Sequence, residues 1–312
     1  MTRLLTLAIV CAVGWTAGPS PAFAQNTSRV ETVKSEDGMG IRFTYYPAMK
    51  EKGTPQDAPV AILLHGAGGS RIVWDKGSAP TGGKSFPETL QDAGFAVLTV
   101  DLRKHGESVP TGGDAKIFPT DYQAMALGDL VAIKAFLKDE HQKKALNMGK
   151  IGIVAADMSC PVAAAFAEYD WKATPYDDAP VLANRTPRGQ DVRALVFLSP
   201  DSTAGRLKTT ASVNFLRAKE FNIAFFGIAG ATDAQDKGQT KKLYELFKSG
   251  SKGEEGAAAD RFFISEPKLK DRGTDLLRKA PAAVETPMFN FLVKYVKEVV
   301  LPWQDRRSKL ER

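Results

Sequence analysis

The chain has 312 residues, of which 43% are hydrophobic and 25% are charged, and this length suits one α/β enzyme domain rather than two ordinary domains. Its 42 Lys and Arg residues exceed its 36 Asp and Glu residues only slightly, and the basic residues are interleaved with acids. Nucleic acid is therefore not an expected partner, because the excess is mild and no basic stripe with interleaved aromatic residues is present.

The first 24 residues have the pattern of a signal peptide. Arg3 precedes the apolar stretch Leu4 to Val13, and Ala22-Phe23-Ala24 matches the small-residue pattern of a signal-peptidase site. A single membrane anchor is the alternative, but the apolar stretch is well short of the ~20 residues that span a bilayer. We therefore expect cleavage after Ala24, no membrane anchor after cleavage, and a periplasmic or secreted protein.

After removal of this segment we expect a single domain over residues 25–303 and a charged C-terminal tail over residues 304–312. Cys160 is then the only cysteine, so no internal disulfide is expected. The chain also lacks the His-x-x-x-His and Glu-x-x-His spacings of metal ligands. We expect neither a metal nor another cofactor.

The apolar pattern predicts strands that alternate with helices. Arg29 to Lys34 and Ile41 to Tyr46 alternate around a turn and predict an edge hairpin, and a helix is expected from Met158 onward. Such alternation indicates an α/β fold with a mostly parallel central sheet and helices on both faces. The other predicted strands are Pro59–Leu64, Phe95–Asp101, Ile151–Ala156, Val192–Leu198, Phe221–Ile228 and Arg261–Ile264, and the other predicted helices are Ser85–Ala93, Asp121–Asp139, Ser212–Lys219, Gln239–Lys248 and Glu285–Val300.

Three motifs in chain order carry a resemblance to the α/β-hydrolase family. His65-Gly66 follows an interior strand as the family's oxyanion-loop motif does, and Asp101 to Ser108 is similar to the loop after the next strand. Ala155 to Ser159 lies where the family has its Gly-x-Ser-x-Gly nucleophile elbow. The resemblance covers Val30 to Val300. Its order resembles the dienelactone-hydrolase-like and esterase branches, which lack a large cap domain.

The resemblance also implies that the positions of the catalytic triad hold other residues. Asp157 stands in place of the nucleophilic serine, Asp233 matches the acid, and Arg272 stands in place of the histidine. All three histidines of the chain precede the elbow, so the order serine, acid, histidine cannot be completed. Arginine stays protonated and cannot act as the base. Serine-hydrolase activity is therefore expected to be lost, which predicts a pseudoenzyme that binds a ligand or a partner.

If the loops converge as in the family, Asp157 and Asp233 flank Arg272. Asp157 is then expected to occupy the oxyanion-hole region or to pair with Arg272 and lock the site. The alternative is that Arg272 points to solvent. The excursion Trp171 to Gln190 is expected to lie over the top of the sheet. It would cover a pocket for a small molecule or a protein partner, formed with His65, Gly66, Ala67, Trp74, Arg103 and Met158.

An active hydrolase with unusual residues is the alternative function. Asp157 is one candidate nucleophile, since haloalkane dehalogenases and epoxide hydrolases of this fold use an aspartate there, but they also need a histidine to cleave the ester intermediate. Ser199, which follows a predicted strand, is a second candidate, and His65 is a candidate base. Ser159 and Cys160 are expected to pack inside the elbow helix instead.

Overall fold

The computed structural model describes residues 28–76, 82–110, 112, 115–251, 256 and 260–311. The predicted signal peptide over residues 1–24 lies outside these residues. Within the described ranges, no helix is both long enough and apolar enough to cross a membrane.

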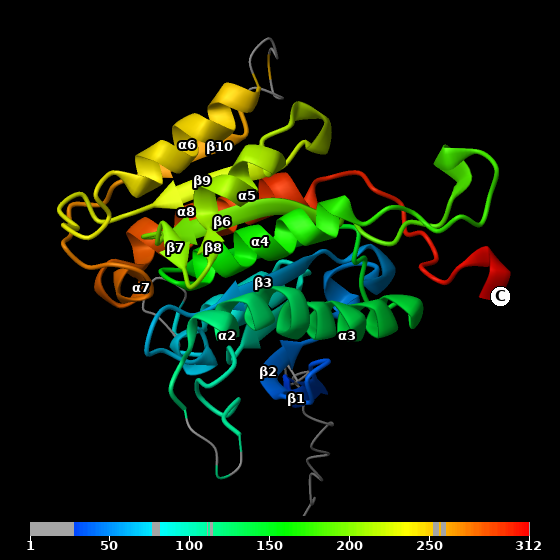
Figure 1. Ribbon diagram of the computed structural model, residues 1–312, viewed down its shortest axis with the longest axis horizontal. Helices are drawn as coiled ribbons and strands as arrows, with labels where there is room; N and C mark the ends of the chain where they lie inside the picture. Colours follow the sequence, from blue (N-terminus) through cyan, green and yellow to red (C-terminus); the bar gives the residue numbers. More distant parts are fainter. Residues whose placement is uncertain are drawn as a thin grey trace, which may run out of the picture.

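An eight-stranded sheet forms the centre of the molecule, in the order β1-β2-β4-β3-β5-β6-β9-β10 (Figure 1). The hairpin strand β2 pairs antiparallel with both β1 and β4, and all other neighbours are parallel. The strands are β1 (Arg29–Lys34), β2 (Gly40–Tyr46), β3 (Val60–Leu64), β4 (Ala96–Val100), β5 (Ile151–Ala156), β6 (Val192–Leu198), β9 (Ala224–Ile228) and β10 (Phe262–Ser265), with a separate small hairpin of β7 (Thr203–Ala204) and β8 (Leu207–Lys208).

Helices cover both faces of this sheet (Figure 1). One core lies under α3, α4, α5 and α6, and the other lies under α1, α7 and α8. The α-helices are α1 (Phe86–Asp92), α2 (Pro119–Ala124), α3 (Leu130–Gln142), α4 (Ser159–Lys172), α5 (Thr209–Leu216), α6 (Gln239–Gly250), α7 (Asp275–Lys279) and α8 (Pro281–Leu292); the π-helical turns are η5 (Met125–Asp129) and η9 (Val293–Lys297), and the short 3₁₀ turns are η1 (Lys50–Lys52), η2 (Pro55–Asp57), η3 (Arg71–Val73), η6 (Leu182–Asn184), η7 (Lys219–Phe221) and η10 (Lys309–Glu311).

The central strands are buried on both sides, which explains their continuous apolar sequence. Gly152 lets the C-terminal helix approach β5, because a Cβ there would come within 2.8 Å of the Leu292 side chain and 2.9 Å of Val296. The predicted fold class, a mostly parallel sheet with helices on both faces, is confirmed. Among the described residues, the chain segments that follow the C-terminal ends of the parallel strands are loops and the small β7–β8 hairpin. They contain no large cap domain.

Three predicted helices differ from the structure. The helix predicted over Ser212–Lys219 is α5, which begins and ends three residues earlier, at Thr209 and Leu216. The helix predicted over 121–139 is divided into α2, η5 and α3. Gly128 in the π-helical turn lies against the hairpin, where a Cβ would come within 2.7 Å of Ser35 Oγ. The last helix was predicted to reach Val300, but α8 ends at Leu292 and η9 ends at Lys297.

The segment Trp171 to Gln190, which was predicted to cover the C-terminal ends of the strands, lies at their N-terminal ends instead. Helix α4 has 14 residues and runs back along the sheet for about 21 Å, so it carries the chain away from the C-terminal end of β5. Trp171 Nε1 then donates to the carbonyl of Val192 at the start of β6, 2.9 Å away. Residues 173–190 therefore project from the end of the sheet remote from Asp157 (Figure 1).

The C-terminal segment over residues 304–311 packs on the domain at this same remote edge. His141 Nε2 lies 2.8 Å from the Gln304 carbonyl, and Gln142 Nε2 donates to Asp305 Oδ1 over 2.7 Å. The guanidinium of Arg306 is buried and forms a 2.6 Å ion pair with Asp191. What we expected to be a charged tail is thus built into the fold.

Candidate functional site

The site centres on the sharp turn between β5 and α4. Strand β5 ends at Ala156 and α4 begins at Ser159, so the chain reverses within two residues. Asp157 has φ 48° in this turn, a left-handed conformation that costs a non-glycine residue about 1–3 kcal/mol. The Asp157 N–H donates to the Leu198 carbonyl at 3.0 Å, and its own carbonyl accepts from Cys160 at 3.1 Å. The nucleophile-elbow geometry is therefore present with an aspartate at its apex.

Arg272 lies directly against this aspartate. Its Nε donates to Asp157 Oδ1 at 2.8 Å, and its Nη2 donates to Asp201 Oδ1 at 2.7 Å and to the Ser199 carbonyl at 2.9 Å. Its Nη1 lies 3.7 Å from Asp233 Oδ2. The structure thus brings Asp157, Asp233 and Arg272 together, and the guanidinium points inward rather than to solvent.

Two glycines leave the space that the Asp157 carboxylate fills. A Cβ at Gly66 or at Gly273 would overlap Asp157 Oδ2. Gly273 also has φ 54°, which favours glycine. Gly66 has no positive φ, so at this position it is the Asp157 carboxylate that leaves no room for a side chain. The carboxylate is therefore enclosed by the oxyanion-loop motif on one side and the Arg272 loop on the other.

One cation faces three carboxylates in this cluster. Burial raises the pKa of Asp157, and the hydrogen bond from Arg272 opposes that rise. Burial likewise raises the pKa of Asp201 against the attraction of Arg272. For Arg272, burial acts to lower the pKa, but its hydrogen bond to Asp157 and the surrounding negative charges outweigh it and raise the pKa. The guanidinium therefore remains charged and holds the acids in place.

A Gly66→Ala substitution tests this packing. We expect it to lower the free energy of unfolding by about 1–3 kcal/mol, because the new methyl group overlaps Asp157 Oδ2. In an Asp157→Ser background the shorter side chain removes the overlap, and the cost is expected to fall below about 1 kcal/mol. Urea unfolding of the two single variants and the double variant measures this coupling. Equal costs in both backgrounds would contradict the placement of the carboxylate.

His65 is not available as a base. It is fully buried, its Nδ1 lies 2.7 Å from the Gly66 carbonyl, and its Nε2 accepts from the Leu102 N–H at 3.1 Å. Burial lowers the pKa of His65 to about 4, so the ring is neutral at pH 7. Both nitrogens are used to fix the loops that follow β3 and β4. Neither ring nitrogen of His65 contacts Asp157 or Ser199, the two candidate nucleophiles, in this arrangement.

Trp74 and Arg103 do not line the site either. Trp74 is 1% exposed and packs against Phe86, with ring centroids 6.2 Å apart. Arg103 is held by two hydrogen bonds to Asp129, at 2.6 and 2.9 Å, and by one to Asp37 at 2.7 Å. Both side chains belong to the interior, because their positions after strand ends turn inward here. Among the described residues, Trp74, Arg103 and the 171–190 excursion therefore do not come together beside Asp157 as the prediction required.

The remaining predicted residues lie around the elbow. Met158 is buried and Ala67 is exposed beside Gly66. Ser159 Oγ bonds to both the N–H and the carbonyl of Ala156, each at 2.8 Å, so it supports the turn. Ser199 is fully buried, and its Oγ has no hydrogen-bond partner among the described residues. No base thus reaches Ser199 within the described part of the chain.

Asp201 was missed by the sequence analysis. It lies three residues beyond β6, on the same sheet edge as Asp157, and its N–H donates to the Asp157 carbonyl at 3.2 Å. The signal was available, since an acid shortly after a parallel strand is brought to the edge where the other site residues lie. Among the described residues, no group of three or more His, Cys, Asp or Glu side chains is arranged to hold a metal ion.

The fold and the elbow define the class to which this protein belongs. A parallel sheet carries a left-handed residue between β5 and α4, and loops from β3, β6, β9 and β10 meet there. A family model described as "Alpha/beta hydrolase family" matches residues 61–307. The chain belongs to the alpha/beta hydrolase family. A search of curated proteins gave no match.

Solved structures show the same fold at low identity. An esterase from Pyrococcus furiosus has 17% identity and a TM-score of 0.58, over 86% of this chain and 92% of the esterase. An acylaminoacyl peptidase from Pyrococcus horikoshii has 14% identity and a TM-score of 0.54, over 89% of this chain and 43% of the peptidase. A proposed dienelactone hydrolase from Klebsiella pneumoniae has 10% identity and a TM-score of 0.54, over 88% and 99%. These similarities establish the fold alone.

Proposed function

We propose that this protein is a family member without serine-hydrolase activity that acts by binding a ligand or a partner. The observation that carries the proposal is the 2.8 Å contact between Arg272 Nε and Asp157 Oδ1. The elbow position holds a carboxylate, and the position of the expected base holds a guanidinium that cannot accept a proton. The two side chains neutralise each other instead of activating a nucleophile.

The positions of the histidines support this proposal. The chain has three, and His65 and His105 pack against each other with ring centroids 4.8 Å apart. His105 Nδ1 lies 3.0 Å from the Arg103 carbonyl, and His141 is bonded to the C-terminal segment at the remote edge. Each histidine therefore bonds to a backbone partner rather than to the Asp157 carboxylate.

A hydrolase in which Asp157 is the nucleophile is the second candidate function. The Asp157 side chain is 14% exposed, so a small electrophile can reach it. An electrophile that reached Asp157 would form an ester that no histidine cleaves, so the reaction would stop after one event. Intact-mass measurement after incubation with an alkyl halide distinguishes this case by a stoichiometric mass gain that Asp157→Asn abolishes.

Export to the periplasm or the medium, with removal of residues 1–24, is also part of the proposal and is tested by sequencing the N-terminus of the mature protein.

The decisive experiment is hydrolysis of p-nitrophenyl acetate and p-nitrophenyl butyrate. We expect the wild-type protein to match Asp157→Ala and the uncatalysed reaction, because loss of both nucleophile and base of a triad costs ~10⁶ in turnover. Circular dichroism of the two proteins controls for folding. Clear wild-type turnover that Asp157→Ala abolishes would overturn the proposal and identify Asp157 as a working nucleophile.

A further inference from the structure

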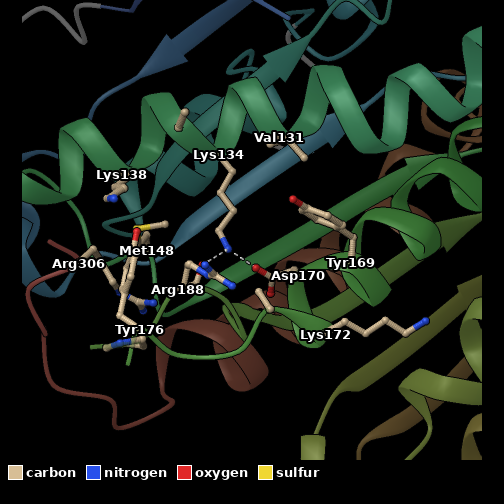
Figure 2. Close-up of a pocket in the computed structure, with 13 residues that line it drawn as sticks. Val131, Lys134, Lys138, Met148, Tyr169, Asp170, Lys172, Tyr176, Arg188 and Arg306 are labelled. Carbon is tan, nitrogen blue, oxygen red and sulfur yellow. Dashed lines mark hydrogen bonds and ion pairs between the residues drawn. The ribbon is translucent and has the colours of Figure 1, made fainter. Parts of the chain in front are cut away.

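A cavity of about 550 Å³ opens at the edge of the sheet remote from Asp157 (Figure 2). Helix α3, the C-terminal end of α4, residues 173–188 and the C-terminal segment form its walls. Much of the wall is apolar or aromatic, with Val131, Met148, Tyr169 and Tyr176 among its residues. A cavity with such walls suits the body of a small organic molecule.

Positive charge dominates the polar part of the wall. Five cations line the cavity together with one carboxylate, Asp170: these cations are Lys134, Lys138, Lys172, Arg188 and Arg306. Lys134 contacts Asp170 and lies 2.8 Å from Asp191, which also pairs with Arg306. Figure 2 shows Lys134 extending from α3 to Asp170 in this way. The floor of the cavity is therefore a neutralised network of ion pairs.

Two of the five cations have no such partner. Lys172 pairs with Glu168, but within the part of the chain that the structure describes no carboxylate lies at salt-bridge distance from Lys138 or Arg188. Both contact the same ring instead. Lys138 Nζ is 5.8 Å and Arg188 Cζ is 5.4 Å from the centroid of Tyr176. A surplus of two positive charges thus lies beside an aromatic wall.

Arg306 provides an independent observation. Its side chain is only 8% exposed, yet its Nε and Nη1 are buried without a hydrogen-bond partner among the described residues. An unpaired buried donor costs about 1–3 kcal/mol, and such groups are uncommon in native structures. Arg306 lines the cavity, so an acceptor group bound there is a candidate partner for these donors.

We propose that this cavity is a binding site for a small organic carboxylate with a planar apolar body. The carboxylate lies between Lys138 and Arg188, and the body lies against Tyr176 and Met148. Arginine and lysine bind carboxylates by charge-assisted hydrogen bonds, and the ring adds area without a charge of its own. Helix α4 begins at Ser159, directly after the elbow, and Asp170 lies 11 residues further along it, or about 16 Å, so the two sites are separate. This site does not rest on the loss of hydrolase activity at Asp157.

Calorimetric titration with 2-naphthoate tests the proposal, with 2-naphthylmethanol as the uncharged match. We expect saturable binding of 2-naphthoate and at least ~10-fold weaker binding of the alcohol. The Lys138→Gln/Arg188→Gln variant is expected to bind 2-naphthoate ~10-fold more weakly. The control variant Lys241→Gln/Lys268→Gln removes two exposed positive charges elsewhere and is expected to stay within about 2-fold of the wild type.

Three results would overturn the proposal. The first is no saturable binding of 2-naphthoate up to about 10 mM, which is weaker than a specific small-molecule site provides. The second is equal affinity for the acid and the alcohol. The third is equal loss in the cavity variant and the control variant, which would indicate attraction to net charge alone. Ester hydrolysis is measured separately, so failure here leaves the proposal for Asp157 intact.

Discussion

An Arg272→Gln variant is expected to lose about 2–4 kcal/mol of unfolding free energy at pH 7. The substitution removes the only cation that contacts Asp157, Asp201 and Asp233 among the described residues, and breaking a buried ion pair from one side leaves uncompensated charge. We place the loss below the range for fully buried pairs because the Arg272 side chain is 20% exposed. Urea unfolding monitored by circular dichroism measures it.

The pH dependence gives this prediction its sharper form. Burial raises the pKa of Asp157 and of Asp201, so the folded state binds protons more tightly than the unfolded state does. Stability then falls as the pH rises from the unfolded carboxyl pKa, about 4, through the raised folded values. Without Arg272 the folded-state pKa of these carboxyl groups rises further. The loss of unfolding free energy in the Arg272→Gln variant is therefore expected to become smaller as the pH is lowered from 7 to 5.

The matched control is Arg278→Gln, one helix further along the chain. Arg278 is 66% exposed and forms a 3.4 Å surface pair with Asp275, so its removal is expected to cost less than about 0.5 kcal/mol. Two results would contradict the role of Arg272 in holding the three carboxylates. The first is an Arg272→Gln variant as stable as this control, and the second is a loss of unfolding free energy that is the same at pH 5 and pH 7.

An Asp157→Ser/Arg272→His double variant is expected to gain esterase activity. Serine at φ 48° would occupy the apex of the elbow, and a histidine at 272 would have Asp201 and Asp233 nearby to orient it. General-base assistance contributes about 10²–10⁴-fold, so p-nitrophenyl acetate hydrolysis is expected to rise above the wild-type background by a factor in that range. The rate is expected to increase through pH 6–7 as the histidine deprotonates.

Single variants serve as controls for this gain. Asp157→Ser alone lacks a base and Arg272→His alone lacks a nucleophile, so both are expected to stay at background, because residues that act as a unit are not additive. Asp157→Ser/Arg272→Gln controls for the loss of the ion pair. If the folded double variant is no faster than these three proteins, the loops do not hold a serine and a histidine in register.

The sequence predicted the fold well because its strands are distinctive. The boundaries of β5 and β6 agree with prediction to the residue, since both are largely apolar segments bounded by polar residues, with Arg193 as the one charged residue inside β6. The placement of Arg272 beside Asp157 also followed from local patterns, since parallel strands deliver their C-terminal loops to one edge. What these residues do is a prediction that the proposed assays test.

The location of the cavity beside residues 173–188 could not be predicted, because it depends on how far α4 continues before the chain leaves it. The segment after α4 reached the remote edge only because α4 continues to Lys172, and no residue pattern around Trp171 marks that end clearly. The inward turns of Trp74 and Arg103 depended on partners distant in sequence, Phe86 and Asp129. Asp201 was not predicted because it follows β6 and is not one of the triad positions of the family motif.

The left-handed turn at Asp157 is held by backbone groups, so it does not depend on the side chain at its apex. A strained backbone persists only where its surroundings determine it, and here these surroundings are the β6 carbonyl of Leu198 and the amide of Cys160 in α4. They belong to the sheet and its crossover helix, not to any reaction. A serine or an aspartate at the apex can therefore occupy the same turn, and exchanging one for the other leaves these backbone hydrogen bonds in place.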